Sequence, residues 1–450
     1  MVNPTWIAKL LQVGFKARTG LENEIEAYKL MRSSNLHQRH TQRSWIKHVV
    51  IGAVAVVIVA VLVTAGVQLT RPVPAPSFSA NVPSTLKTVP NPSTGGIPWP
   101  TTGAAGMVVP GVVSFPPVGS KSPLPIASIT KVMTALVVLQ DHPLSPGQQG
   151  PSITITPSDV SEFNLEAAAK DSVVPVTAGE QLSEYQCIEA ILVPSADNIA
   201  HVLAKWDAGS ASAFVAKMNA LAHQWGLTNT HFADTSGLSS SSTSTPSDLL
   251  ILGQKAMANP IVSAVVAMPS ITLPGVPKPM PTYNFALFEN GIVGIKTGSD
   301  GPAGGCFLFA ANVKVNGTIR LAYGVVLGQQ NAKSSLDQAL KVSVNLLTAL
   351  HGVLNGVALV HAGQEVGTLK SPDGTSTPLL SSGTVTLIGA PGTTVSTTFH
   401  LRRFKPGAPI PARSRVGTLK IQVGSQVKTV GIVSDRSLPA VSSKWKLLNF

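Results

Sequence analysis

One run of residues constrains this chain more than any other feature. From Val49 to Leu69 the sequence holds 21 consecutive uncharged, predominantly apolar residues. At a rise of about 1.5 Å per residue, a helix of this length spans the ~30 Å hydrocarbon core of a bilayer. A cleaved signal peptide is the alternative, but its apolar region usually holds about 7 to 15 residues behind a short leader, and here 48 residues precede the run. We therefore predict a single, uncleaved transmembrane helix over 49–69.

The charges on either side of this run indicate its orientation. The chain carries 33 Lys and Arg against 21 Asp and Glu, a formal net charge of +12. Residues 1–48 hold eight of the basic residues and three Glu, whereas only Arg71 and Lys87 follow within twenty residues of the run. Basic flanks stay in the cytoplasm. We expect a cytoplasmic N-terminus and an extracytoplasmic remainder, which excludes nucleic acid as a partner of the remainder.

Composition divides the chain into five segments. A basic cytoplasmic tail (1–48) precedes the membrane helix (49–69). Residues 70–97 are rich in Pro with Ser, Thr and Gly between, the composition of an extended, semi-rigid linker. Helical and strand patterns alternate over 98–350. From 351 to 450, short Val-, Thr- and Leu-rich stretches separated by Gly and Pro predict a small all-β domain.

Local patterns predict several elements within the mixed region. Helical spacing indicates three helices, the first of them apolar on nearly every face and therefore buried all round: Ala127–Leu139, Phe214–Trp225 and Ser334–Leu350. Two strand-like runs flank the dipeptide Asn316-Gly317, a strong hairpin signal: Phe307–Val313 and Thr318–Leu327.

The first chemical motif is Ser128-Ile129-Thr130-Lys131, at the start of the predicted buried helix. Residues i and i+3 share a helix face, so the Lys131 amine can reach the Ser128 hydroxyl. A serine nucleophile needs an adjacent base, and a lysine desolvated in a cleft can serve as one. Alone the motif is weak, because Ser128 could simply cap a core helix and Lys131 could extend from it to solvent.

Two further motifs follow in a meaningful order. Ser195-Ala196-Asp197 comes second, and Lys296-Thr297-Gly298 comes third, shortly before the predicted hairpin. On a strand edge, the third motif offers an ammonium and a hydroxyl to a substrate carboxylate, while its glycine admits close approach of a substrate backbone. An S-x-x-K, an S-x-N or variant, and a K-T-G in this order are the signature set of penicillin-recognising serine enzymes.

The flanking residues extend the match. PIASITKVMTALVVL, LVPSADNIA, FADTSGL and GIKTGSDGPAGGCFLFA resemble the D-alanyl-D-alanine carboxypeptidases among the low-molecular-mass penicillin-binding proteins. The resemblance covers roughly residues 98–350. It implies an α+β transpeptidase fold, in which an all-α lobe and a five-stranded antiparallel sheet flanked by helices enclose the active-site cleft.

The resemblance also implies the reaction and its residues. Ser128 would attack the penultimate D-Ala carbonyl of a peptidoglycan stem peptide, with Lys131 as general base and Ser195 relaying a proton toward the leaving amine. Lys296, Thr297 and Gly298 would hold the terminal carboxylate. The backbone N–H groups of Ser128 and Ser299 would form the oxyanion hole. β-Lactams would act as covalent inhibitors, and the protein would be anchored in a bacterial cell membrane with its catalytic domain facing an anionic cell wall.

One residue departs from the family pattern. Asp197 stands where the second motif usually ends in Asn, and Asn198 follows it. An amide can donate a hydrogen bond to a substrate carbonyl, whereas an ionised carboxylate can only accept. Asp197 could instead pair with Lys131 or Lys296 and hold that lysine charged. An active carboxypeptidase therefore competes with a catalytically weak peptidoglycan-binding protein.

A serine β-lactamase is the third functional hypothesis, because these enzymes share the three motifs. Class A β-lactamases resemble this pattern but use a deacylating glutamate after the second motif. Here no Glu follows Ser195 until Glu289, and Glu162 and Glu166 precede the motif. The sequence therefore disfavours this reading, and it leaves carboxypeptidase and endopeptidase activity on stem peptides open.

The remaining candidates point to packing rather than chemistry. Without a G-x-S-x-G serine, we expect His201, His223 and His231 to be packing or surface residues and not members of a catalytic triad. Cys187 and Cys306 are too few for a disulfide framework or a zinc site, and we expect two unpaired buried thiols. We expect no cofactor and no metal ion. A basic group in the last domain is expected to be a solvated face: Arg402, Arg403, Lys405, Arg413 and Arg415.

Overall fold

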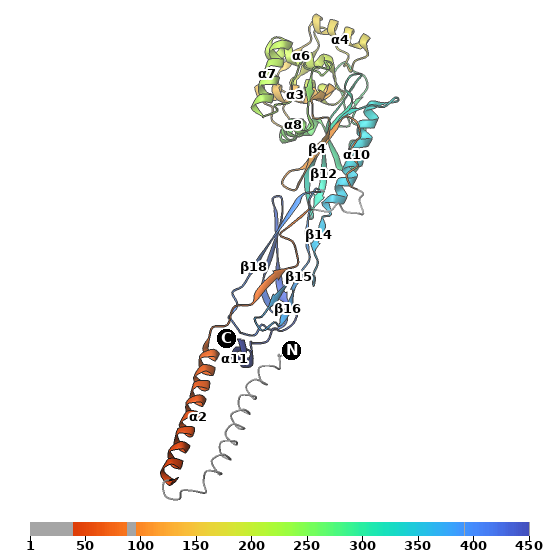
Figure 1. Cartoon of the computed structure of the whole chain (residues 1–450). Coiled ribbons are helices and arrows are strands. Elements are labelled where there is room, and N and C mark those ends of the chain that lie inside the picture. Colours follow the sequence, from red (N-terminus) through yellow and green to blue (C-terminus); the bar gives the residue numbers. More distant parts are fainter. Residues whose placement is uncertain (1–38, 88–95, 391, 450) are drawn as a thin grey trace.

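The computed structural model describes residues 39–87, 96–390 and 392–449. Figure 1 shows an elongated molecule, with a long helix at one end, a β-rich domain in the middle and a mixed helix and sheet domain at the far end. Most of the predicted cytoplasmic tail lies outside the described residues.

The long helix is α2 (Arg39–Thr70), and it contains the apolar run. Within Trp45–Thr70, a stretch of 18 residues has a mean hydropathy of 2.9, and none of that stretch is buried by the rest of the chain. The hydroxyl groups of its apolar part are satisfied within the helix, since Thr64 Oγ1 donates to the Ala60 carbonyl at 2.8 Å and Thr70 Oγ1 donates to that of Gly66 at 3.1 Å. The helix is long and apolar enough to cross a membrane.

A five-stranded antiparallel sheet forms the frame of the mixed domain. Its spatial order is β11-β12-β13-β3-β4, with β3 (Ala104–Val109), β4 (Val113–Gly119), β11 (Ile292–Asp300), β12 (Gly304–Val315) and β13 (Thr318–Gln329). The predicted hairpin is confirmed: Val315 pairs with Thr318, and Asn316 and Gly317 both adopt positive φ, as a tight two-residue hairpin turn requires.

Side chains of β12 alternate between two hydrophobic cores. Phe307 and Phe309 pack into one core with Leu347 of α10 (Ser335–Leu354), the predicted helix after the hairpin. Leu308, on the opposite face, belongs to the core of the helical lobe. Because both faces of the sheet are covered, the strand is almost continuously apolar instead of alternating with polar residues.

The helical lobe packs on the second face. Its helices are α3 (Thr130–Asp141), α4 (Pro157–Ala169), α5 (Glu184–Leu192), α6 (Asp197–Ala208), α7 (Ala211–Gln224), α8 (Pro246–Ala258) and α9 (Pro260–Val265). α3 is buried from Thr130 to Leu139, so the prediction of a helix buried all round is confirmed there. Short strand pairs brace the loops: β5 (Leu124–Pro125) with β8 (Thr243–Ser244), β6 (Ser152–Thr154) with β7 (Gln181–Ser183), and β9 (Ser270–Ile271) with β10 (Met280–Pro281).

The C-terminal residues form the expected β-rich domain. Its seven-stranded sheet has the order β1-β15-β16-β20-β19-β18-β2. The strands from this part of the chain are β15 (Glu365–Lys370), β16 (Ser376–Ser381), β18 (Thr394–Leu401), β19 (Arg415–Val423) and β20 (Gln426–Ser434). A separate pair, β14 (Val357–Val360) with β17 (Val385–Leu387), and a terminal helix, α11 (Ser443–Asn449), complete it.

The segment expected to be a linker supplies both edges of this sheet. β1 (Ser77–Ala80) pairs with β15, and β2 (Thr85–Lys87) pairs with β18. Residues 70–97 are therefore not a spacer throughout, because their middle part is built into the C-terminal domain. The chain leaves α2, completes the two edges of the β domain, and only then enters the mixed domain, which places the β domain between α2 and the mixed domain (Figure 1).

The two domains are joined by hydrogen bonds as well as by chain crossings. Gln426 Nε2 lies 2.9 Å from the Val112 carbonyl of the mixed domain and 2.6 Å from the Ile388 carbonyl. Ile388 and Ala390 are buried in the same core as α10. The β domain is thus packed against the mixed domain and not merely tethered to it.

Candidate active site

The first motif begins in a tight turn. η3 (Ala127–Ile129) leads directly into α3, so Ser128 lies at the entrance of that helix with a partly exposed side chain. Ala127 has a φ of 46°, a conformation that residues with a Cβ rarely adopt. Two glycines make room for the turn. A Cβ at Gly237 would lie 1.9 Å from the Ala127 carbonyl oxygen, and one at Gly298 would lie 3.0 Å from the Ser128 nitrogen.

Lys131 is fully buried one turn further along the chain. Its Nζ lies 2.8 Å from Ser128 Oγ, 2.6 Å from Asp197 Oδ1 and 2.8 Å from the Ser236 carbonyl oxygen. Besides its bond to carbon, a lysine nitrogen has three tetrahedral positions, each an N–H bond or a lone pair, and one oxygen lies opposite each of them. The amine is thereby held against the serine hydroxyl by two fixed acceptors.

The second and third motifs meet beside this pair. Lys296 is buried on β11, and its Nζ lies 3.0 Å from Ser195 Oγ and 3.1 Å from the Thr297 carbonyl. Ser195 has a φ of 64°, which turns the chain sharply before α6. Burial, and secondarily the charge on Lys131, lower the pKa of Lys296 well below its usual value, while Asp197 opposes this.

Asp197 pairs with Lys131 and not with Lys296, the two partners that the sequence left open. Its second oxygen, Oδ2, accepts the backbone N–H of Ser172 at 3.1 Å, so both carboxylate oxygens are occupied. Asn198 does not supply the missing amide to the cleft. It is buried, and its side chain bonds both backbone groups of Val174, as acceptor at 3.0 Å and as donor at 2.9 Å.

The third motif runs along the edge strand of the sheet. Among the described residues β11 is paired on one side only, with β12, and Gly298 brings it against the turn at Ser128. Thr297 is buried and Ser299 is exposed. The chain therefore places all three motifs around one point, at the edge strand of the sheet and beside the exposed Ser299.

The stretch FADTSGL was matched in the sequence, but no role was predicted for the residues in it that fix the loop after α7. The Ser236 carbonyl is the third partner of Lys131. Asp234 holds this loop, because its Oδ2 accepts the backbone N–H groups of Gly237 and Leu238 at 2.7 and 2.8 Å. The run Asp-Thr-Ser-Gly from Asp234 to Gly237 is rich in turn-forming residues and could have revealed the loop. The contact of the Ser236 carbonyl with Lys131 could not be predicted, because it joins residues that only the tertiary structure brings together.

The other candidates lie as expected. Cys187 and Cys306 are free and buried, and burial raises the pKa of the Cys306 thiol to about 12. His223 and His231 are exposed. His201 is partly buried and paired with Glu166, and no serine is among its recorded partners in the described part of the chain.

Comparison with known proteins places the chain in a family. A family model described as D-alanyl-D-alanine carboxypeptidase matches residues 119–331. A D-alanyl-D-alanine carboxypeptidase of a Streptomyces species is 32% identical over 200 residues, which are 41% of this chain and 67% of that protein. The chain belongs to the D-alanyl-D-alanine carboxypeptidase family.

Other members of this family match shorter stretches. A D-alanyl-D-alanine endopeptidase of Haemophilus influenzae is 36% identical over 137 residues, 30% of this chain and 43% of that protein. A carboxypeptidase of Mycobacterium tuberculosis is 33% identical over 153 residues, 33% of this chain and 48% of that protein. The chain thus spans roughly half the length of most curated family members it matches. A solved Streptomyces K15 DD-transpeptidase is 26% identical, with a TM-score of 0.47 and coverage of 55% of this chain and 98% of its own.

Proposed function

We propose that this chain is a serine-type D-Ala-D-Ala carboxypeptidase, which removes the terminal D-Ala from peptidoglycan stem peptides through an acyl-enzyme on Ser128. The observation that carries the proposal is the contact of Ser128 Oγ with the buried Nζ of Lys131 at 2.8 Å, beside a second Ser–Lys pair at 3.0 Å. The family relationship supports the same activity.

Lys131 is arranged to act as the base. A neutral amine has two N–H donors and one lone pair. With the donors directed at Asp197 and the Ser236 carbonyl, the lone pair faces the Ser128 hydroxyl. When Ser128 attacks the carbonyl carbon of the penultimate D-Ala, its proton passes to Lys131, and the resulting ammonium is stabilised by the Asp197 carboxylate.

The second Ser–Lys pair is arranged to serve the leaving group. As the C–N bond breaks, the departing amine takes a proton from the Ser195 hydroxyl, and Lys296, whose Nζ lies 3.0 Å from Ser195 Oγ, returns a proton to that hydroxyl. The lowered pKa of Lys296 makes its proton easier to pass to Ser195. Lys296 and Thr297 would hold the substrate carboxylate beside Gly298, and the N–H groups of Ser128 and Ser299 would bind the oxyanion, a contribution of about 3 kcal/mol per donor. Water then hydrolyses the ester and regenerates Ser128.

One observation favours a second candidate. Both oxygens of Asp197 are engaged and neither can donate to a substrate carbonyl, so one contact usual in the family is missing. A protein that binds D-Ala-D-Ala ends and acylates slowly would have the same fold. The two candidates differ in turnover and not in binding.

Release of D-Ala from diacetyl-Lys-D-Ala-D-Ala separates them. The purified full-length protein should release D-Ala, and Ser128→Ala should release none while keeping the same melting temperature. Binding of the peptide by the wild type without any release would refute the carboxypeptidase and leave the binding protein. β-Lactams should acylate the wild type at Ser128 and not the Ser128→Ala variant.

We also propose that α2 anchors the protein in the bacterial cell membrane, with its N-terminus in the cytoplasm. The apolar stretch of α2 and the basic residues before it support this topology. The β domain would then stand between the bilayer and the catalytic domain and hold the active site away from the membrane. In spheroplasts, added protease should digest the catalytic domain and spare an N-terminal epitope tag. Digestion of the tag instead would reverse the orientation.

A further inference from the structure

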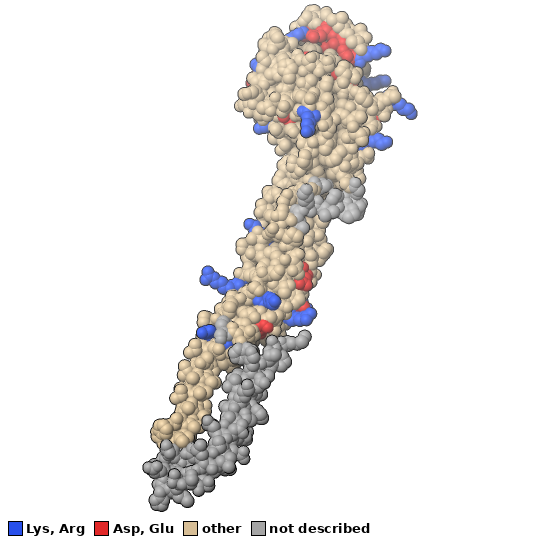
Figure 2. All heavy atoms as spheres, in the orientation of Figure 1, with Lys and Arg blue, Asp and Glu red and all other residues tan. Residues whose placement is uncertain are grey.

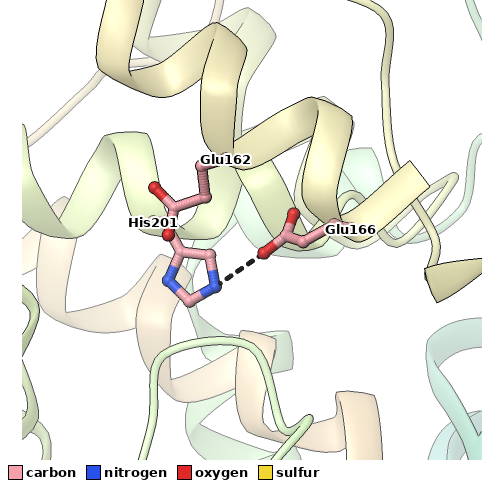
Figure 3. Close-up of side chains that lie close together, drawn as sticks. All are labelled: Glu162, Glu166 and His201. Carbon is pink, nitrogen blue, oxygen red and sulfur yellow. Dashed lines mark ion pairs between the residues drawn. The ribbon is translucent and has the colours of Figure 1, made fainter. Parts of the chain in front are cut away.

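A cluster of metal-ligating side chains lies outside the active site, between α4 and α6. Glu162 and Glu166 are four residues apart on α4 and share one face. His201 of α6 faces them, as Figure 3 shows. One ligand atom from each of the three residues lies within 4.8 Å of the other two.

Glu166 supplies an independent reason to look for a ligand here. The residue is only 9% exposed, and its Oε1 lies 3.1 Å from His201 Nε2. Its other oxygen, Oε2, is buried and has no hydrogen-bond partner among the described residues. A buried carboxylate oxygen without a partner is costly, and a bound cation removes that cost.

The imidazole of His201 is oriented for ligation. Its Nδ1 lies 3.0 Å from the hydroxyl of Thr235, in the loop after α7. Histidines that bind metals generally donate their second ring nitrogen to a fixed acceptor, which sets the tautomer and leaves the other nitrogen for the ion. With Nδ1 bonded to Thr235, Nε2 is the nitrogen that faces Glu166, whose Oε1 lies 3.1 Å away (Figure 3).

The surrounding charge also favours a divalent cation. Three carboxylates lie here, those of Asp159, Glu162 and Glu166, against one ammonium, that of Lys205. With His201 neutral as a ligand, their sum is two negative charges. Figure 2 shows acidic atoms gathered at the end of the helical lobe where α4 lies in Figure 1.

We propose that Glu162, Glu166 and His201 bind one divalent transition-metal ion of the zinc class, which ties α4 to α6. Zinc takes carboxylate and imidazole ligands at about 2.0–2.2 Å, which sets them about 3.4 Å apart, and three protein ligands leave a fourth position for water. The required movement is within reach of Glu162, whose side chain is 31% exposed and gives the ion a path from solvent. When Glu162 turns from Lys205 to the ion, Lys205 still has an ion pair with Asp159, at 3.2 Å.

A metal ion here departs from the expectation that the chain binds none, which rested on its two cysteines. The ion would have a structural role, because it would not touch the catalytic residues. Its link to them runs from His201 to Thr235, which precedes Ser236 in the chain. Binding therefore does not depend on the proposed peptidase activity.

Zinc binding by the full-length protein tests the site. After chelator treatment and dialysis, titration calorimetry with zinc chloride alone should give one site per chain. Glu162→Gln and His201→Gln should each weaken it by at least about tenfold, whereas His223→Gln and Glu289→Gln, on exposed positions elsewhere, should leave it unchanged. Zinc should raise the melting temperature of the wild type and not that of Glu162→Gln.

Glu162→Gln carries the test if His201→Gln fails to fold, because the Glu162 side chain is partly exposed and its variant should fold normally. A wild type that binds no zinc would overturn the proposal. Zinc bound equally well by the wild type and Glu162→Gln would place the ion elsewhere and overturn it too.

Discussion

Glu184 should make the stability of the helical lobe depend on pH. It is the first residue of α5 and is fully buried, and neither carboxylate oxygen has a hydrogen-bond partner among the described residues. Burial raises the pKa of Glu184 to about 7 from 4.5, and the charge of Asp207 adds to the effect. The perturbation we consider is Glu184→Gln, which keeps the shape of the side chain and removes its titration.

The magnitude follows from the two pKa values. Below pH 4.5 the carboxyl of Glu184 is protonated in both the folded and the unfolded chain. As the pH rises from 4.5 to 7, the unfolded chain loses this proton and the folded chain keeps it, so the free energy of unfolding falls. At about 1.4 kcal/mol per pKa unit, the total loss is about 3 kcal/mol, and the curve is flat above pH 7.

Urea unfolding of the full-length protein in detergent, at a series of pH values from 4.5 to 8, measures this loss. The difference between Glu184→Gln and the wild type should grow in favour of the variant by about 3 kcal/mol across the series. The exposed Glu289→Gln is the matched control and should run parallel to the wild type. Parallel curves for Glu184→Gln and the wild type would refute the reasoning.

Three further substitutions test particular contacts. Asp197→Ala should destabilise the protein by about 3–5 kcal/mol, because it leaves the buried Lys131 amine without the carboxylate that it pairs with at 2.6 Å; an unchanged urea midpoint would contradict that pairing. Gly237→Ala should slow acylation by benzylpenicillin at least about tenfold, since its Cβ would meet the carbonyl of Ala127 at 1.9 Å; wild-type acylation kinetics would show that the turn tolerates displacement. Gln426→Ala should cost about 1–3 kcal/mol and expose the junction between the domains to limited proteolysis; a wild-type digestion pattern would mean that the hydrogen bonds do not hold the domains together.

The local elements were predictable because their signals are local. The dipeptide Asn316-Gly317 specifies its own turn, and the apolar run Phe307–Val313 before it marks the strand that became part of β12. The resemblance carried by the three motifs implied that they meet in one cleft, and the S-x-x-K spacing on one helix face predicted the contact between Ser128 and Lys131.

Two features could not be predicted, for one physical reason. β1 pairs with β15 across nearly three hundred residues, and nothing in the Pro-rich composition around Ser77–Ala80 signals a strand that forms only at the edge of a distant sheet. Likewise, Asp197 could have paired with Lys131 or Lys296. The choice depends on where α6 lies relative to α3, with Ser172 fixing the second carboxylate oxygen. Both outcomes are set by tertiary contacts between segments far apart in the sequence.

The central claim is that Ser128 trims stem peptides at their D-Ala-D-Ala ends. Mass spectrometry of muropeptides, after incubation of purified peptidoglycan fragments with the full-length protein, tests it most directly. Pentapeptide stems should be converted to tetrapeptides by the wild type, and Ser128→Ala should leave them intact. Pentapeptides that persist with the wild type, or that are shortened equally by Ser128→Ala, would contradict the claim.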